Sequence, residues 1–409
     1  MKVYLWGIGK GFDKALSSLN TEKVEVIGII DNNPALFHKF HKGYEVFPSN
    51  EINAEYDYII ITVVQYKTIL FQLNKMRISA DKIICYYDMN AWNTQQTGVF
   101  YKELWKLDII EQKVSELERK SDIRIRNLRY EIAEDIMNLK YKFPMIKNGT
   151  CAVEKILNEG KSLIRFGDGE FEIMAGKNRP VFQNYDEQLS ARMRAVITAK
   201  DERILIAIAN NYGNLDKYTE EVADAIREYM TDEVRQFHYS VLDFNKVYYD
   251  AYMFKCYYPY KDKTGTQERL HLVKRIWDKR DIVIIEGEKT RSGVGNDLFD
   301  NTNSLKRILC PTQNAFSCYE KILNESLKIN KKSLILVILG PAGKVLAYDL
   351  VQAGYQVVDV GQIDMDYEWY LAGQGIRVPI ANKYVSQLPP AEIGEINNKS
   401  YIDQIIAKI

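Results

Sequence analysis

The sequence has few cysteines and no long apolar run. Its five cysteines are far apart in a chain of 409 residues, and no two form a C-x-x-C pair, so neither a zinc site nor a disulfide framework is indicated. The most apolar run, 334–339, is far too short to cross a bilayer, and we expect no transmembrane segment. A protein of the reducing cytoplasm is therefore expected, with peripheral attachment at the inner membrane face left open.

The chain also lacks an excess of charge of either sign. Its 55 basic residues balance its 55 acidic residues, so no overall electric field favours nucleic acid, and nucleic-acid binding is not expected. Any site for a polyanion must be local. A hydrophobic content of 46% with 27% charged residues is typical of globular proteins, and the length predicts two or three domains.

Residues 1–95 alternate between short apolar runs and helical patterns. Strands are expected at 3–6, 24–30, 57–64 and 82–86, and helices at 12–19 and 67–76. This alternation is typical of a doubly wound parallel sheet. The glycine turn 7–11, followed by Asp31, resembles the dinucleotide-binding fingerprint, although Phe12 stands where its third glycine would fall. A nicotinamide-dependent oxidoreductase using this domain is therefore one alternative function.

Residues 96–144 are rich in charge and carry a sparse apolar stripe. Its members recur every three or four positions: Leu107, Ile110, Val114, Leu117, Ile125, Leu128, Ile132, Ile136 and Leu139. Ser121 and Arg124 interrupt the stripe. The spacing predicts a long amphipathic helix, or two helices, over about 100–141. It is either a connector packed on its own domains or a short coiled coil that forms a homodimer.

Residues 145–409 predict a second α/β domain. Apolar runs of strand length occur at 162–166, 203–209, 281–286, 307–310, 334–339 and 356–360. Their near-continuous apolarity indicates parallel strands covered on both faces. The predicted fold class is therefore α/β, with two Rossmann-like doubly wound parallel-sheet domains joined by a long helical connector. Ligands in such sheets bind at the carboxyl ends of the strands.

Asp168 and Glu170 directly follow the first of these runs and alternate with glycines. In a locally extended loop both carboxylates would project to the same side. Mn²⁺ and Mg²⁺ are held by one or two carboxylates, with waters and substrate phosphate as the other ligands. The two residues are thus candidate metal ligands, and an ordinary polar turn after a strand is the alternative.

Three later strand ends also carry polar or glycine-rich segments. Arg291, after the 281–286 run, can clamp a phosphate. The segment 340–344 is expected to form a glycine turn leading into a helix at 345–352, whose N-terminus favours anions. Asp364 and Glu368 are four residues apart, so on a helix they share a face and can activate an acceptor hydroxyl. Each segment also has an ordinary structural reading as a charged loop, a tight turn or a solvated helix face.

Several motifs taken together resemble one protein family. They are Arg165-Phe-Gly-Asp-Gly-Glu170, Arg291 with Gly293-Val-Gly-Asn-Asp-Leu-Phe299, Cys310-Pro-Thr-Gln-Asn-Ala-Phe316, Leu346-Ala-Tyr-Asp-Leu350 and Asp364-Met-Asp-Tyr-Glu-Trp369. Their ordered set resembles the GT-D type of bacterial glycosyltransferase, which includes enzymes that extend glycans on surface adhesins. The sequence departs from the family at Gln362, where histidine is usual, so the resemblance does not extend to sugar preference.

The resemblance implies a UDP-sugar site with an Asp-x-Glu motif at the metal, here Asp168 and Glu170. Residues expected to bind the donor are Arg165, Gly167, Arg291, Gly293, Asn296, Gly340 and Gly343, and the candidate catalytic carboxylates are Asp297, Asp364 and Glu368. The predicted function is Mn²⁺- or Mg²⁺-dependent transfer of a hexose from a UDP-sugar to a sugar hydroxyl of a glycan or glycoprotein. A non-catalytic nucleotide-sugar-binding scaffold is a further alternative.

Overall fold

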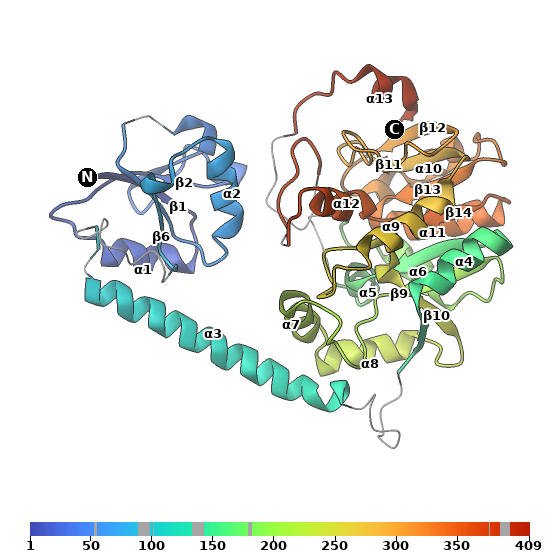
Figure 1. The fold of residues 1–409 in the computed structure, drawn as a ribbon, viewed down its shortest axis with the longest axis horizontal. Helices are drawn as coiled ribbons and strands as arrows, with labels where there is room; N and C mark the ends of the chain where they lie inside the picture. Colours follow the sequence, from blue (N-terminus) through green and yellow to red (C-terminus); the bar gives the residue numbers. More distant parts are fainter. Residues whose placement is uncertain are drawn as a thin grey trace. The chain divides into compact units, whose positions relative to one another are not determined.

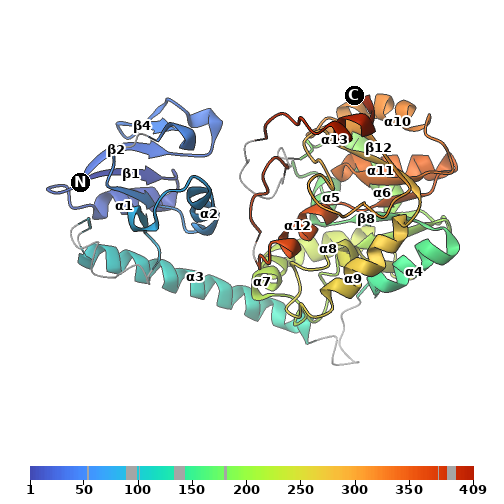
Figure 2. The same cartoon turned by 45° about the horizontal axis from the view of Figure 1, so that its top comes forward.

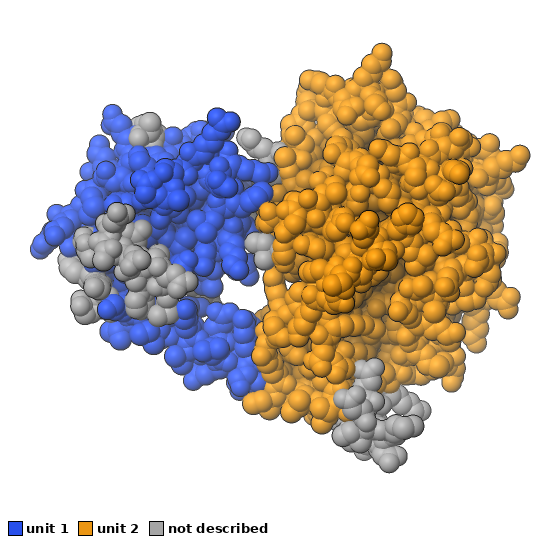
Figure 3. All heavy atoms as spheres, in the orientation of Figure 1, with its two compact units in different colours: residues 1–122 blue, residues 123–409 orange. Residues whose placement is uncertain are grey.

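The chain divides into two compact units. The computed structural model describes residues 1–52, 55–88, 99–100, 102–132, 143–178, 182–375, 377–384 and 393–409. Unit 1 is Met1–Asp122 and unit 2 is Ile123–Ile409 (Figure 3). The division falls inside helix α3 (Lys102–Glu131), not at the predicted limits of 95 and 144. The expected long helix is confirmed over these bounds, whereas Ile136 and Leu139 of its stripe lie outside the described residues.

Unit 1 is built on a six-stranded sheet of order β3-β4-β2-β1-β5-β6. Its elements are β1 (Lys2–Trp6), α1 (Lys10–Ser18), β2 (Glu25–Ile30), β3 (Phe40–His41), β4 (Tyr44–Phe47), β5 (Tyr58–Ile61), α2 (Lys67–Lys75) and β6 (Ile83–Cys85). Only the short β3 pairs antiparallel. Val3 and Leu5 pack with α1 and the first part of α3, while Tyr4 and Trp6 pack with α2 on the other face. The predicted doubly wound sheet is thereby confirmed.

The glycine turn of unit 1 is held by the protein's own groups. Asp31, which the dinucleotide fingerprint would place on a ribose, instead accepts hydrogen bonds from the backbone N–H groups of Ile8 (3.0 Å) and Asn33 (2.8 Å). Phe12 is buried in the core. A Cβ on Gly11 would lie 2.0 Å from the carbonyl oxygen of Thr62. Because Gly11 has no side chain, it allows helix and strand to approach closely.

Unit 2 is built on a nine-stranded sheet whose order is β15-β12-β11-β13-β14-β8-β9-β10-β7. All pairs in it are parallel. Its elements are β7 (Met145–Lys147), α4 (Gly149–Glu159), β8 (Ser162–Phe166), α5 (Asp168–Met174), α6 (Glu187–Thr198), β9 (Ile204–Ile208), α7 (Glu220–Tyr229), α8 (Asp232–Val241), β10 (Val247–Asp250), α9 (Thr266–Lys274), β11 (Asp281–Gly287), β12 (Ser304–Cys310), α10 (Tyr319–Ser326), β13 (Leu334–Ile338), α11 (Gly340–Gln352), β14 (Val357–Asp359), α12 (Ile363–Leu371), α13 (Lys399–Gln404) and β15 (Ile405–Lys408).

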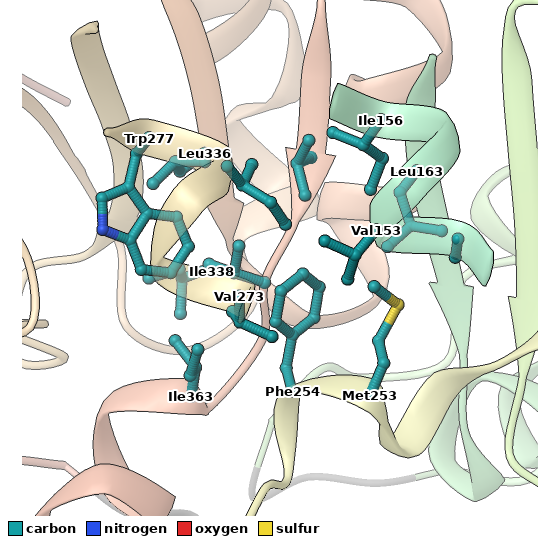
Figure 4. Packing of buried hydrophobic residues seen from close by; sticks show 14 of the residues in the cluster. Val153, Ile156, Leu163, Met253, Phe254, Val273, Trp277, Leu336, Ile338 and Ile363 are labelled. Atoms are coloured by element: carbon teal, nitrogen blue, oxygen red, sulfur yellow. The ribbon is translucent and has the colours of Figure 1, made fainter. Parts of the chain in front are cut away.

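Helices cover both faces of this sheet, as its apolar strands predict. Helices α6, α10 and α11 pack together on one face, and α4 and α9 on the other (Figures 1 and 2). The core beneath α4 and α9 includes Ile156, Phe254, Val273 and Trp277 (Figure 4). Trp277 and Phe254 are at most 1% exposed, so this layer fixes the strands whose ends form the site described below.

The last part of α3 is anchored to α7 and α8 within unit 2. Arg227 donates to both carboxylate oxygens of Glu131, at 2.7 and 3.0 Å. Tyr130 donates its hydroxyl to Asp232 at 2.7 Å, and the guanidinium of Arg235 stacks 3.9 Å from the Tyr130 ring centroid. In the part of the chain that the structure describes, no helix is both long and apolar enough to cross a membrane.

The close packing at Gly11 predicts that alanine substitutions at Gly11 and at the nearby Gly9 lower the stability of unit 1 by different amounts. Gly11→Ala is expected to destabilise unit 1 by about 1–3 kcal/mol because the new methyl group overlaps the Thr62 carbonyl. Gly9→Ala is the matched control, since nothing lies within 4 Å of its added Cβ, and should cost less than about 1 kcal/mol. Hydrogen exchange of the β1 and β5 amides measures both. Equal protection in the two variants would contradict the packing role of Gly11.

Candidate active site

A cavity of about 430 Å³ opens at the carboxyl edge of the unit 2 sheet. Residues at or just beyond seven strand ends line it: Gly167 after β8, Ala209 after β9, Ala251 after β10, Gly287 at the end of β11, Pro311 after β12, Leu339 after β13 and Val360 after β14. Parallel strands bring these ends to one edge, because every strand points the same way. The cavity therefore lies at the strand ends where the sequence predicts a ligand site.

Asp168 and Glu170 both line the cavity, but the loop carrying them is helical. The expected extended loop is wrong, because Asp168 begins α5 and Gly167 is its N-cap. The Glu170 carboxylate turns back and accepts the Gly167 N–H at 2.8 Å, which is the glutamate half of a capping box. The Asp168 carboxylate accepts from the Asn211 side-chain amide at 2.8 Å, and Asn211 accepts from the Tyr252 hydroxyl at 3.0 Å. Asp168 is thus held in a fixed orientation at the cavity.

A buried histidine, His238, packs against α5. The His238 ring stacks on Phe171 of α5 with 3.8 Å between ring centroids. Its two ring nitrogens are 2.7 and 3.0 Å from the hydroxyls of Tyr212 and Tyr229, respectively. Burial lowers the pKa of His238 to about 3, with Arg235 adding to the effect, so the ring is neutral at physiological pH. The tyrosine hydroxyls and the ring form a rigid support for α5.

Asp359, at the end of β14, links two cations on the cavity wall. It is 2% exposed, and one oxygen lies 2.5 Å from the Lys344 ammonium of α11. Arg165 of β8 donates to the other oxygen at 3.2 Å and to the Asp359 carbonyl at 2.8 Å. Burial raises the pKa of Asp359, but Lys344 and Arg165 outweigh it and hold the pKa below its ordinary value. Lys344 also lies 3.6 Å from Glu170.

Two glycines serve this arrangement in different ways. Gly361 has a φ of +50°, and a Cβ there would lie 1.7 Å from the Arg165 guanidinium, so no larger residue fits. The expected turn at 340–344 is wrong, because α11 begins at Gly340. Gly340 lines the cavity as predicted. Gly343 lies inside the helix, outside the described lining, where an added Cβ would be 2.8 Å from Val337 of β13.

The segment after β11 does not present its polar groups to the cavity in the predicted way. Arg291 donates to the backbone carbonyls of Asn382 (3.0 Å) and Gly394 (2.7 Å), so it binds the C-terminal segment. Glu286 is fully buried and pairs with Arg307. Arg291, Gly293 and Asn296 all lie outside the described lining. Thr290 and Ser292 of the same segment do line the cavity.

Asp364 and Glu368 share a face of α12, as their spacing predicts, and converge on the same partners. Lys383 lies 2.7 Å from both carboxylates, and the Asn296 amide donates to both at 2.8 Å. Asp364 also accepts the Gly293 N–H at 2.9 Å. It is fully buried, which raises its pKa although Lys383 opposes the effect. Of these two carboxylates, only Asp364 belongs to the cavity lining that the structure describes.

Asp297, the third candidate catalytic carboxylate, lies outside the described lining. It accepts a hydrogen bond from the Tyr367 hydroxyl at 2.6 Å and pairs with Lys274 at 3.2 Å. The Tyr367 hydrogen bond and then Lys274 lower the pKa of Asp297, although burial opposes them. Its side chain is 58% exposed, so it forms a surface ion pair with Lys274 beside Tyr367 of α12.

The cavity also contains charged residues that the sequence reasoning did not select. Lys255 lies within the tyrosine-rich segment 248–260 and lines the cavity together with Tyr252 and Tyr258. Among the described residues the Lys255 ammonium has no hydrogen bond or ion pair, and it lies 4.8 Å from the Tyr252 ring centroid. Burial lowers the pKa of Lys255 to about 8, with Arg377 and Arg165 contributing. The described lining holds four basic residues (Arg165, Lys255, Lys344, Arg377) and four acidic ones (Asp168, Glu170, Asp359, Asp364).

Comparison with known protein families assigns the two parts of the chain separately. A family described as "Glycosyltransferase GT-D fold" matches residues 163–388, more than half of the chain. The family "C2185-like, N-terminal" matches residues 1–84. The larger match contains the whole cavity lining, so the cavity is a feature of the GT-D part.

Two curated proteins are similar to the chain. Glycosyltransferase GlyD of Streptococcus pneumoniae serotype 4 is 34% identical over 287 residues, which is 70% of this chain and 35% of GlyD. The probable glycosyl transferase Gly of Streptococcus gordonii is 34% identical over 262 residues, which is 63% of this chain and 38% of that protein. The chain therefore spans little more than a third of the length of these relatives.

Solved structures agree with the family match. A structure described as showing that the highly conserved domain of unknown function 1792 has a distinct glycosyltransferase fold is 32% identical, with a TM-score of 0.62 over 65% of this chain and 95% of its own. A structure described as a new glycosyltransferase of this domain type from Streptococcus sanguinis has 32% identity and a TM-score of 0.61, covering 65% of this chain and all of its own. The chain belongs to the GT-D fold family of glycosyltransferases.

Loss of Lys344 is expected to destabilise unit 2 more than loss of an exposed lysine. Lys344→Met leaves Asp359 buried with only Arg165 as its cation, and the expected cost is about 3–5 kcal/mol. Lys328→Met is the matched control, because Lys328 forms an exposed pair with Glu325, and should change stability by less than about 1 kcal/mol. Urea unfolding at pH 7 measures both variants. Similar values would show that the Lys344 pair does not stabilise the fold.

Proposed function

We propose that this chain is a metal-dependent glycosyltransferase that moves a hexose from a UDP-sugar to a sugar hydroxyl of a glycan or glycoprotein. The observation that supports this proposal most directly is the cavity at the carboxyl edge of a GT-D sheet, which is lined by oriented carboxylates and by cations. Similarity to GlyD and to the probable glycosyl transferase Gly supports the reaction class. The need for a nucleotide sugar places the proposed activity in the cytoplasm, which suits five free thiols.

The donor set of the cavity fits a hard divalent ion shared with a diphosphate. Among the described residues no group of three or more histidine, cysteine, aspartate or glutamate side chains could hold a metal alone. Mg²⁺ and Mn²⁺ suit sites with one or two carboxylates completed by water and phosphate oxygens. Asp168, oriented by Asn211, would bind the ion directly. Glu170, engaged by the Gly167 amide and Lys344, would act through water.

Charge balance supports joint binding of ion and donor. The four cations and four carboxylates of the described lining already balance. A diphosphate arriving alone would bring two uncompensated negative charges into a partly buried site, whereas a diphosphate with a divalent ion is neutral overall. The metal, when bound, would neutralise the charge that develops on the departing diphosphate.

Residues of the chain itself would stabilise the rest of the diphosphate. Lys255 is a cation at the cavity without an ion pair among the described residues, and the N-terminus of α11 meets the cavity at Gly340. A helix N-terminus adds free amides and a partial positive charge. Arg165 and Lys344 are already bound to Asp359, and would supply electrostatic potential from fixed positions. Tyr252 and Tyr258 offer aromatic faces for a base or sugar.

The three candidate bases differ in their surroundings. Asp364 borders the cavity, but its oxygens accept from Gly293, Asn296 and Lys383. We assign Asp364 a positioning role, in which it fixes the segment after β11 against α12. Asp297 and Glu368 lie outside the described lining.

The proposed function predicts turnover of a UDP-hexose that depends on Asp168. With Mn²⁺, slow hydrolysis or transfer is expected from at least one member of a panel of UDP-hexoses, and a chelator should abolish it. Asp168→Asn keeps the size of the side chain but removes its charge, so kcat/KM should fall by about a hundredfold or more. Asp216→Asn, at an exposed position, is the control. Donor binding without turnover would favour the scaffold alternative, and metal-independent turnover unaffected by Asp168→Asn would contradict the metal role.

Lys255 predicts a pH dependence of donor affinity. Its pKa of about 8 means that the ammonium is mostly charged at pH 7 and loses its charge as the pH rises through 8. The KM for the donor should therefore rise between pH 7 and pH 9, by about tenfold, in the wild type. Lys255→Arg stays charged and should keep a flat KM, while Lys255→Met should have a raised KM at both values. A wild-type KM that does not change over this range would exclude Lys255 as a diphosphate ligand.

The oxidoreductase alternative gains no support. The comparisons match unit 1 to a C2185-like N-terminal family, and unit 2 to glycosyltransferases. Within unit 1, the Asp31 carboxylate accepts hydrogen bonds from the N–H groups of Ile8 and Asn33, and Gly11 packs closely against Thr62. The features that resembled a dinucleotide fingerprint therefore have structural explanations.

A further inference from the structure

Helix α3 carries a second apolar face besides the one that packs on its own units. Trp105 and Ile109 are buried in unit 1, and Asn127 and Tyr130 are buried in unit 2. A separate set of apolar side chains on α3 and just past its end is 41–68% exposed: Leu107, Ile110, Val114, Leu117, Ile125, Leu128 and Ile132. An amphipathic surface helix needs only one apolar stripe, so this outer stripe is unexplained by the fold of the chain.

The outer stripe begins with coiled-coil spacing. Leu107 and Val114 occupy the a positions of two heptads, and Ile110 and Leu117 occupy the d positions. Ser121 and Arg124 stand at the next a and d positions, and the apolar pattern resumes at 125, 128 and 132. Ile125 follows Val114 after eleven residues, which is a heptad with four residues inserted. An insertion of this kind is a stutter, which locally unwinds a coiled coil without ending it.

Charges beside the stripe distinguish between possible partners. The g positions before Leu107, Val114 and Ser121 are Lys106, Lys113 and Lys120, and the e positions after Ile110 and Leu117 are Glu111 and Glu118. In a parallel pair, each g residue meets the e residue of the next heptad on the other helix, which joins Lys106 to Glu111 and Lys113 to Glu118. In an antiparallel pair, lysine would face lysine and glutamate would face glutamate. The pattern is complementary to a parallel copy of itself.

We propose that α3 forms a parallel two-stranded coiled coil with a second copy of this chain. Val114 at a with Leu117 at d favours two strands, whereas Leu107 at a with Ile110 at d favours a larger number. The proposal follows the second heptad, which lies nearer the middle of α3. Existing ion pairs do not prevent the pairing: Glu111 binds Lys14 at 2.9 Å, but its side chain is still 70% exposed. The proposal is independent of the glycosyltransferase activity and assigns a homodimer interface to the outer stripe.

Sedimentation equilibrium of the full chain over a concentration series tests the proposal. The wild type should form a dimer, and Leu117→Asp should raise the dissociation constant by about tenfold or more, because a carboxylate enters a d position. Leu117 is 67% exposed in the single chain, so the variant should stay folded by circular dichroism. Ser115→Asp, exposed on the same helix at a b position, is the matched control. A monomeric wild type, or a dimer insensitive to Leu117→Asp, would overturn the proposal.

Cysteine cross-linking tests the parallel orientation. Val114→Cys places a thiol at an a position, where the two copies of the residue meet in a parallel coil, and should form an intermolecular disulfide on mild oxidation. Ser115→Cys, one residue away, should not. A combined Lys106→Glu and Lys113→Glu variant should dissociate by itself and pair with a Glu111→Lys and Glu118→Lys variant when mixed. No cross-link at position 114, or charge variants that dimerise like the wild type, would contradict the parallel arrangement.

Discussion

The carboxylate of Asp359 is the interaction on which the geometry of the cavity depends. It ends β14 inside the protein, where an unpaired charge would be costly, and its two oxygens bind Lys344 of α11 and Arg165 of β8. Lys344 lies in turn near Glu170, whose carboxylate caps the helix that begins at Asp168. One buried charge thereby links two adjacent strands and two helices, and it fixes the carboxylates and cations at the sites where a metal-bound diphosphate is proposed to bind.

A second buried carboxylate at the same cavity, that of Asp364, holds neighbouring segments together. Asp364 receives the Gly293 N–H, the Asn296 amide and the Lys383 ammonium, which ties the segment after β11 to α12 and to the chain that follows it. Several polar residues selected as catalytic or donor-binding therefore hold loops at the strand ends. A parallel sheet brings many chain ends to one edge, and loops that surround a cavity need internal partners for their backbone groups.

The fold was largely predictable because its strands are near-continuous apolar runs, and the shared face of Asp364 and Glu368 followed from their four-residue spacing. The helix at Asp168 was missed because its N-cap, Gly167, has no side chain, and only Glu170 three residues later supplies half of a capping-box pattern. The partners of Asp359 and Asp364 were not predictable, because Lys344 and Lys383 reach them only through tertiary packing. Lys255 also gave no local signal, since its lack of an ion-pair partner among the described residues is a property of the folded cavity.

The central claim is that donor and divalent ion bind together at the cavity of unit 2. Isothermal titration of UDP into the wild-type chain, with Mn²⁺ and then with a chelator, tests it most directly. The charge balance of the cavity predicts that UDP binds at least about tenfold more tightly when Mn²⁺ is present, and that Mn²⁺ gains the same factor from UDP. Equal UDP affinity with and without the ion would contradict the account.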